Sequence, residues 1–234
     1  MQLPLFYSEK IGEVGQVIEL DEDNSRHIVQ VLRMQEGDLL HLTDGLGHLM
    51  TAEISHSHKK HATVQVKQLD KQERHTRKVC MAVSLLKNNN RLEWFFEKAA
   101  EMGVHQIVPL LCDRTEKPHF KTERFRSILI SAMLQSQQSW LTELGEPQKF
   151  SSFIKTVIPG KGYIAHCLSE DKKIGIAHIP SLENIIMLIG PEGDFTPNEI
   201  ALAMEQGCQP VSLGKTRLRT ETAALVASTF LCIS

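Results

Sequence analysis

The chain has 234 residues, a net charge of −2 and 23% charged residues, a length and balance that allow one or two folded domains and exclude intrinsic disorder. No apolar run is long enough for a membrane span, the N-terminus does not resemble a signal peptide, and the five widely spaced cysteines disfavour a disulfide framework and a cysteine zinc site. We therefore expect a soluble, cytoplasmic protein without a metal, in which any nucleic-acid contact comes from local basic patches.

The first 70 residues show the alternation of apolar and polar residues that is typical of β-strands. Three segments alternate in this way: 16–20, 39–43 and 63–67. A short helix is predicted over 25–32, with Asn24 or Ser25 as its N-cap. Several short strands at this spacing favour a small β-barrel.

A polar run over 70–78 contains no apolar residue and separates this region from a segment with a different hydrophobic period. We interpret the run as a linker between two domains, because domain boundaries fall in exposed polar stretches. The alternative is a long hairpin loop inside one domain.

From residue 79 onward, apolar runs of strand length alternate with helical patterns. Strands are expected at 79–86, 105–112, 161–167, 184–190 and 209–213, and helices at 90–102, 123–140, 196–206 and 220–231. The helix at 196–206 has the clearest start signal, since Thr196 and Glu199 form a capping box around Pro197. Strands alternating with helices predict an α/β domain with a largely parallel sheet.

Two glycine-containing loops follow predicted strands late in the chain. The first is Gly190-Pro-Glu-Gly193, and the second runs from Gly214 through Lys215, Arg217 and Arg219. Ligands bind beyond the carboxyl ends of parallel strands, and glycines there allow close approach of the main chain, so both loops are expected to line one cleft. A plain strand-to-helix turn and a solvated capping loop are the alternatives. Neither loop carries a dinucleotide or P-loop fingerprint.

Other candidate residues have structural interpretations that are at least as good. The aromatic residues of the helix at 91–103 fit an amphipathic helix packed on the sheet, and Lys87 before it is a weak candidate for a phosphate contact. Three histidines could in principle bind a metal, although a solvated hairpin is favoured: His56, His58 and His61. His166 either lines a pocket or packs in the core.

Four motifs, in this order along the chain, resemble those of RsmE-type methyltransferases, the ribosomal RNA small subunit uracil-N3 methyltransferases of the SPOUT superfamily. They are His27–Met34 followed by Gly37-Asp38, Lys98–Val104, Gly190–Gly193 and Leu213–Ala223. The resemblance runs from about residue 3 to the end of the chain. At two positions the sequence departs from the usual pattern: Asp194 stands where a second glycine is usual, and Gln138 stands where an arginine is often found.

The resemblance implies a fold and partners. Residues 1–72 would form a PUA-like β-barrel that binds RNA, and residues 76–234 would form a SPOUT methyltransferase domain, an α/β fold with a C-terminal trefoil knot. Proteins of this kind are homodimers with the site near the dimer interface. The implied partners are therefore 16S ribosomal RNA in the 30S subunit and a second copy of the chain.

The resemblance also implies S-adenosylmethionine as the cofactor, held by the loops of the knot. The residues expected to contact it are Ala165, His166, Leu168, Ile189, Gly190, Pro191, Glu192, Gly193, Ser212, Leu213, Gly214, Leu218, Thr222 and Ala223. The residues expected to contact RNA are Arg33, Arg74, Arg77, Lys87, Lys98, Lys215 and Arg217.

The implied reaction assigns catalytic roles to Arg219 and Glu221. Uracil N3 attacks well only after it loses its imide proton, so the site needs a base or a cation that stabilises the uracil anion. Arg219 suits the second task because its charge is permanent and its donors are planar. Glu221 could accept the proton, but a carboxylate beside an arginine is a weak base, so we expect it to fix Arg219.

Two other functions fit parts of the same pattern. A SPOUT enzyme could act on a different RNA base or on transfer RNA, and a relative without methyl transfer could serve as an RNA-binding assembly factor. The PUA-like domain and the two loop motifs favour small-subunit rRNA over a different target. The intact pair Arg219 and Glu221 and both glycine loops argue against a relative without methyl transfer. A dinucleotide-dependent reductase would need a glycine fingerprint that this sequence lacks.

Overall fold

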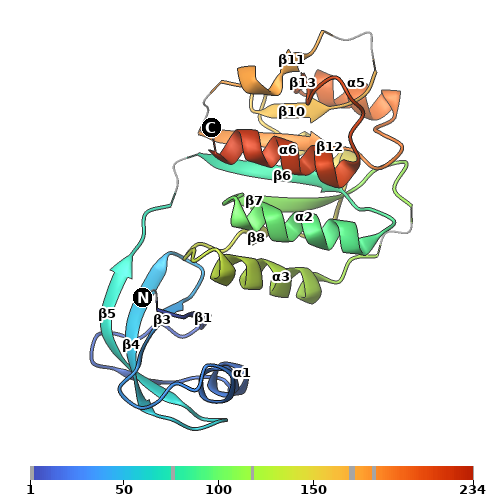
Figure 1. Cartoon of the computed structure of the whole chain (residues 1–234). Coiled ribbons are helices and arrows are strands. Elements are labelled where there is room, and N and C mark those ends of the chain that lie inside the picture. Colours follow the sequence, from blue (N-terminus) through green and yellow to red (C-terminus); the bar gives the residue numbers. More distant parts are fainter. Residues whose placement is uncertain (1–2, 75–76, 117–118, 169–171, 181–182, 234) are drawn as a thin grey trace. The chain divides into compact units, whose positions relative to one another are not determined.

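The computed structural model describes residues 3–74, 77–116, 119–168, 172–180 and 183–233, and its chain divides into two compact units (Figure 1). The first unit comprises residues 1–74 with 133–141, and the second comprises residues 75–132 with 142–234. The boundaries expected from the sequence place the segment 133–141 in the second domain, whereas here it belongs to the first unit. That residues 1–72 and 76–234 form two independent domains stays a prediction.

The first unit is built on a five-stranded sheet in the order β1-β3-β4-β5-β2. Its strands are β1 (Leu5–Tyr7), β2 (Val17–Glu19), β3 (Leu39–Thr43), β4 (His48–His56) and β5 (Thr63–Lys71). β1 pairs with β3 in parallel, and the other pairs are antiparallel. Alternate residues of β3, β4 and β5 are buried in one apolar cluster, which is the arrangement expected of a half-buried antiparallel sheet.

Two features of this unit differ from the sequence-based expectation. The first helix, α1 (Glu22–Arg26), begins earlier than predicted, because the Asp21 carboxylate caps it by accepting a hydrogen bond from Asn24 N at 2.8 Å. The chain then continues as a π-helix over His27–Val31. The second difference is that β1 and β4 were not predicted, although the buried residues Met50, Ala52 and Ile54 of β4 alternate with exposed or half-buried ones. Alanine and methionine are not typical strand residues, which weakened the signal.

Trp140 fixes the segment 139–141 to the first unit. Gly47 N donates to Ser139 O at 2.8 Å, Leu141 N donates to Gly45 O at 2.8 Å, and the indole N–H of Trp140 donates to Gln72 O at 3.1 Å. The helix predicted over 123–140 is shorter in the structure, where α3 spans Thr122–Gln135. It ends there because Gln137 adopts a left-handed conformation with φ of 58°. The linker is also shorter than predicted, since β5 extends to Lys71.

The second unit is a parallel sheet of eight strands, which confirms the predicted α/β class. Its strands are β6 (Lys78–Ser84), β7 (Gln106–Leu111), β8 (Glu143–Leu144), β9 (Gln148–Lys149), β10 (Gly162–Ala165), β11 (Ile174–Gly175), β12 (Asn184–Ile189) and β13 (Gln209–Ser212). Seven of them follow the order β11-β13-β10-β12-β6-β7-β8, and β9 pairs with β7.

Helices cover both faces of this sheet. Besides α3, they are α2 (Asn89–Glu101), α4 (Phe150–Phe153), α5 (Pro197–Glu205) and α6 (Thr220–Ile233), with 3-10 turns at Ile154–Thr156 and Ile176–His178. α2 and α6 pack against each other on one face (Figure 1), while α4 and α5 share an apolar cluster with buried strand residues on the other. The predicted capping box of α5 is confirmed, since Thr196 N donates to Glu199 Oε2 at 2.8 Å and Glu199 N donates to Thr196 Oγ1.

The position of β10 sets the geometry of the carboxyl edge of the sheet. β10 pairs in parallel with both β12 and β13, so that Ala165 is opposite Ile189 on one side and Val211 on the other. Three loops therefore leave the sheet side by side at one edge, where ligands of α/β proteins bind. The trefoil knot concerns how the chain is threaded, which strand order does not establish, and it stays a prediction.

No helix within the described part of the chain is both long enough and apolar enough to cross a membrane.

We expect Gly47→Ala to destabilise the first unit more than Gly37→Ala. Both glycines have left-handed φ angles, of 88° and 93°, so an alanine costs about 1–2 kcal/mol at either position. A Cβ at Gly47 would also overlap the Trp140 ring, whereas no described atom lies within 4 Å of one at Gly37. Overpacking should add roughly 1–3 kcal/mol to the loss of unfolding free energy in urea, and equal losses would contradict this role of Trp140.

Candidate functional site

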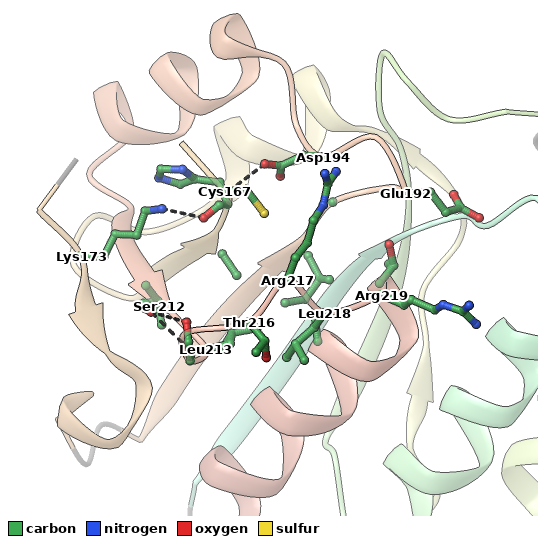
Figure 2. Close-up of a pocket in the computed structure, with 18 of the residues that line it drawn as sticks. Cys167, Lys173, Glu192, Asp194, Ser212, Leu213, Thr216, Arg217, Leu218 and Arg219 are labelled. Carbon is green, nitrogen blue, oxygen red and sulfur yellow. Dashed lines mark hydrogen bonds between the residues drawn. The ribbon is translucent and has the colours of Figure 1, made fainter. Parts of the chain in front are cut away.

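A cavity of about 510 Å³ opens at the carboxyl edge of the parallel sheet, where the loops after β10, β12 and β13 meet the start of α6 (Figure 2). Most residues expected from the sequence to contact a cofactor line it, namely Ala165, His166, Ile189, Gly190, Pro191, Glu192, Ser212, Leu213, Gly214, Leu218 and Ala223. Lys215, Arg217 and Arg219 line it as well. The structure therefore brings together the two glycine loops that the sequence singled out.

Three expected contacts lie outside the described lining. Leu168 is exposed beyond the end of β10, and Gly193 lies against the Arg114 side chain, which donates a hydrogen bond to its carbonyl. Thr222 is on a different face of α6 from Ala223, because residues three and four apart share a face of a helix and residues one apart do not.

Six residues of the lining were not proposed from the sequence: Cys167, Lys173, Asp194, Val211, Thr216 and Thr220. Val211, Thr216 and Thr220 flank or lie within the second glycine loop, so the motif itself pointed to their place. Asp194 was noted only as a departure from the usual glycine. Lys173 lies in no motif, and only the fold brings it to the cavity.

Gly190 allows a tight turn that buries an aromatic side chain. A Cβ at this position would lie 3.0 Å from both the main-chain nitrogen and a ring carbon of Phe195. Phe195 is 2% exposed and packs against Phe150 with a ring-centroid distance of 5.2 Å. Gly190 is thus required by packing as well as lining the cavity, and a larger residue there would disturb the core.

Two charged side chains hold the main chain at the end of β10. Asp194, with φ of 65°, accepts hydrogen bonds from Cys167 N at 2.7 Å and from Phe195 N at 2.8 Å. Lys173 Nζ donates to His166 O at 2.7 Å and to Leu168 O. Figure 2 shows Lys173 and Asp194 approaching this segment from two sides.

The basic loop carries side chains that point in different directions. Arg217 extends toward Asp194, whereas Arg219 points away from the cavity (Figure 2). Lys215, Arg217 and Arg219 are exposed. The main chain of Arg219 is fixed, because its carbonyl accepts a hydrogen bond from Ala223 N at 2.8 Å at the start of α6. The site therefore presents exposed cationic groups beside a main chain that is held at Arg219.

Glu221 is buried in the first turn of α6, and its ion pair differs from the one expected. Its Oε1 lies 3.7 Å from Nε of Arg91 on α2, rather than against Arg219. Its Oε2 is buried and has no hydrogen-bond partner among the residues described. The side chain lies beneath the helix start and outside the cavity lining.

The remaining RNA candidates are scattered. Lys87 pairs with Glu116 at 2.9 Å, and this hydrogen bond raises the Lys87 pKa. Lys98 forms ion pairs with Glu101 and Glu97, which raise its pKa. The two carboxylates also neutralise its positive charge, so Lys98 is a poor phosphate contact. Arg33 and Arg74 belong to the first unit, and Arg77 donates to Pro180 O in the second. The guanidinium of Arg74 lies 5.0 Å from the centre of the Trp140 ring.

The histidines of the β4–β5 hairpin form a stacked row. The ring centroids of His56 and His58 are 6.2 Å apart, and those of His58 and His61 are 5.6 Å apart. His61 lies 2.9 Å from Glu19, and His56 lies 3.3 Å from Glu36. Within the described ranges, no group of three or more His, Cys, Asp or Glu residues is arranged to hold a metal ion.

Comparison with known proteins gives consistent matches for both parts of the chain. The sequence model of an RNA methyltransferase domain matches residues 72–232, and that of an RNA methyltransferase PUA domain matches residues 20–67. A Synechocystis protein named ribosomal RNA small subunit methyltransferase E is 32% identical over 210 residues, which cover 86% of this chain and 68% of the relative.

Solved structures match over nearly the whole chain. A probable rRNA-methyltransferase from Porphyromonas gingivalis is 35% identical with a TM-score of 0.89, covering 97% of this chain and 96% of that one. A ribosomal RNA small subunit methyltransferase E from Neisseria gonorrhoeae, bound to S-adenosyl methionine, is 28% identical with a TM-score of 0.87 and the same coverage.

We expect Cys167 to be the thiol most readily alkylated, and only at high pH. Cys167 is an exposed residue at the cavity. The partial burial of its thiol, followed by the negative charge of Asp194, raises the pKa of that thiol. Because only the thiolate reacts, its rate with iodoacetamide should reach half of its maximum above the ordinary thiol pKa of about 8.5. Mass spectrometry of the modified peptides measures this, with Cys167→Ser as the control. A midpoint below pH 8 would contradict the proposed environment.

Proposed function

Because this chain belongs to the RNA methyltransferase family and has a ribosomal RNA small subunit methyltransferase E as a 32% identical relative, we propose that it transfers a methyl group from S-adenosylmethionine to N3 of a specific uridine in 16S ribosomal RNA. One observation carries the proposal: three strand-end loops line a single cavity, and the last of them carries the basic residues of 215–219. The enclosed cavity suits a cofactor, and the basic residues suit a polyanion.

The residues of the cavity fit S-adenosylmethionine. The volume of about 510 Å³ is within the range of small-molecule sites. Leu213, Leu218 and Ala223 offer apolar surface for the adenine, and the main chain at Gly190 and Gly214 is accessible for polar contacts. The carboxylates of Glu192 and Asp194 at the cavity suit a ligand with cationic groups. We propose that these apolar, main-chain and acidic groups together hold the cofactor.

Arg219 is suited to bind the uracil in its reactive form. Bound S-adenosylmethionine would supply an electrophilic methyl group on its sulfonium. The permanent positive charge and planar donors of Arg219 would stabilise the anion that remains when N3 loses its proton. The side chain points away from the cavity here (Figure 2), so we propose that it turns inward when RNA binds, because catalytic contacts commonly tighten in the substrate complex.

Glu221 is proposed to act as a positioning residue. Its carboxylate is buried two residues after Arg219, where a negative charge stabilises the N-terminus of α6. Its ion pair with Arg91 links the start of α6 to α2. We therefore propose that Glu221 fixes the helix start that carries Arg219, and not the guanidinium itself.

The proposed target requires an accessible base. N3 is on the Watson–Crick edge of uracil, so the nucleotide must be unpaired or turned out of its helix. Lys215 and Arg217 at the cavity are the best placed phosphate contacts, and Arg33 and Arg74 of the first unit are further candidates. The match of this unit to the PUA model and the names of the relatives favour small-subunit rRNA over another RNA.

We further propose that the chain acts as a homodimer. α2 and α6 pack together and leave large apolar side chains exposed, among them Trp94 at 42%, Phe230 at 43% and Ile233 at 67%. Large apolar side chains that stay exposed on two neighbouring helices suit an interface with another protein surface. A second copy of the chain is the occupant that the family resemblance implies.

We expect Arg219→Ala to lower methyl transfer to 30S subunits about 100-fold or more, as loss of one charge-stabilising donor typically does. The affinity for S-adenosylmethionine should stay within about twofold, because the guanidinium points away from the cavity. Mass spectrometry of nucleosides measures N3-methyluridine, and calorimetry measures binding. Arg126→Ala, at an exposed position on α3, is the control. Equal losses of transfer and binding would contradict the role of Arg219.

We expect Ala223→Leu to weaken binding of S-adenosylmethionine by roughly 10-fold or more, because the larger side chain occupies the cavity. This position is preferable to Gly190, where any side chain would meet Phe195. Ala201→Leu, the same change on an exposed face of α5, should leave the affinity unchanged. Unchanged affinity in Ala223→Leu, measured by calorimetry, would refute this placement of the cofactor.

A further inference from the structure

His166 and Cys167 line the cavity as part of the segment 166–168, at a point where the sheet no longer holds the chain. β10 ends at Ala165, which is its last residue paired with β12 and with β13. Beyond it, three main-chain groups are bound by side chains instead: His166 O, Cys167 N and Leu168 O. Main-chain polar groups need partners, so the conformation of this wall depends on the side chains that supply them.

Asp194 binds one side of the segment and is itself anchored in the core. Its Oδ2 accepts from Cys167 N at 2.7 Å, and its Oδ1 accepts from Phe195 N at 2.8 Å, next to the buried Phe195 ring. Its φ of 65° is one that glycine adopts without strain and other residues adopt rarely. Asp194 therefore bears backbone strain in the conformation in which its carboxylate accepts these two hydrogen bonds.

Lys173 binds the opposite side of the same segment. Its ammonium donates to the carbonyls of His166 and Leu168, and it immediately precedes β11, which pairs with β13 at Ile174 and Val211. The charges match the polarity of the main chain: the carboxylate takes an N–H group, and the ammonium takes two carbonyls. Hydrogen bonds of this charge-assisted kind are stronger than those between neutral groups.

We propose that Asp194 and Lys173 are positioning residues that hold the end of β10 in its cofactor-binding conformation before S-adenosylmethionine arrives. The inference rests on the proposed function, because it assumes that the cavity takes this cofactor. A wall that is already ordered spares the ligand the cost of ordering it. If the competent conformation were populated only about a tenth of the time, the apparent Kd would rise about tenfold.

Asp194→Gly tests the proposal directly, because it removes the carboxylate and also relieves the backbone strain. We expect the Kd for S-adenosylmethionine to rise about 10-fold, and the KM for the cofactor to rise with it while kcat at saturation is retained. Lys173→Met should have a similar effect. The loss of affinity in the double variant should be much smaller than the product of the two single losses, since both side chains hold the one segment 166–168. Asp194→Asn, which keeps one accepting oxygen, should be intermediate.

Hydrogen exchange provides a second readout that needs no cofactor. In the cofactor-free protein, peptides that contain residues 163–168 should exchange faster in Asp194→Gly and in Lys173→Met than in the wild type. Gln137→Gly is the matched control: it relieves a left-handed φ of 58° in the first unit, and should change neither affinity nor exchange at 163–168.

The two arms separate this proposal from the proposed function. Wild-type affinity and unchanged exchange at 163–168 in Asp194→Gly would overturn the positioning role while leaving the cofactor site intact. A wild-type protein that does not bind S-adenosylmethionine would overturn the cofactor assignment, and with it the cofactor half of this proposal. In that case, unchanged exchange in the variants would also overturn the claim that these side chains order the segment.

Discussion

The parallel pairing of β10 with both β12 and β13 is the constraint on which the site depends. It places Ala165 between Ile189 and Val211, so that three strands end in one row. The loops that leave these ends are more than twenty residues apart in sequence, yet they enclose one cavity. A different neighbour for β10, or an antiparallel pairing, would carry the glycine turn and the basic loop to separate places and leave no shared pocket.

The cavity is also notable for how its walls are held. The turn that follows β12 is fixed by the packing of Phe195 beneath Gly190, and the segment after β10 is fixed by a carboxylate and an ammonium. The basic loop, in contrast, is anchored through its main chain and leaves its cationic side chains exposed. Walls held in this way suit a small cofactor, and the exposed positive charges beside them suit a large polyanion.

Local signals in the sequence were the most reliable. The capping box of α5 was predicted because it depends on a few neighbouring residues, and the α/β class was predicted because each strand and helix has its own local pattern of apolar residues. The cap of α1 was placed wrongly because Asp21, Asn24 and Ser25 are all residue types that cap helices. What the sequence could not supply were contacts between distant segments. Lys173 belongs to no motif, and the choice of Arg91 as the partner of Glu221 follows from the packing of α2 on α6.

The segment around Trp140 has a consequence for the modularity of the chain. Gly45, Gly47 and Gln72 bind residues 139–141, so the first unit is completed by a piece of polypeptide that follows α3. The N-terminal unit is therefore not a fragment that ends at the linker. Expressed as residues 1–74 alone, it would lose the indole that covers its turn. An exchange of this unit between related proteins would have to carry the distant segment with it, or supply a matching aromatic residue.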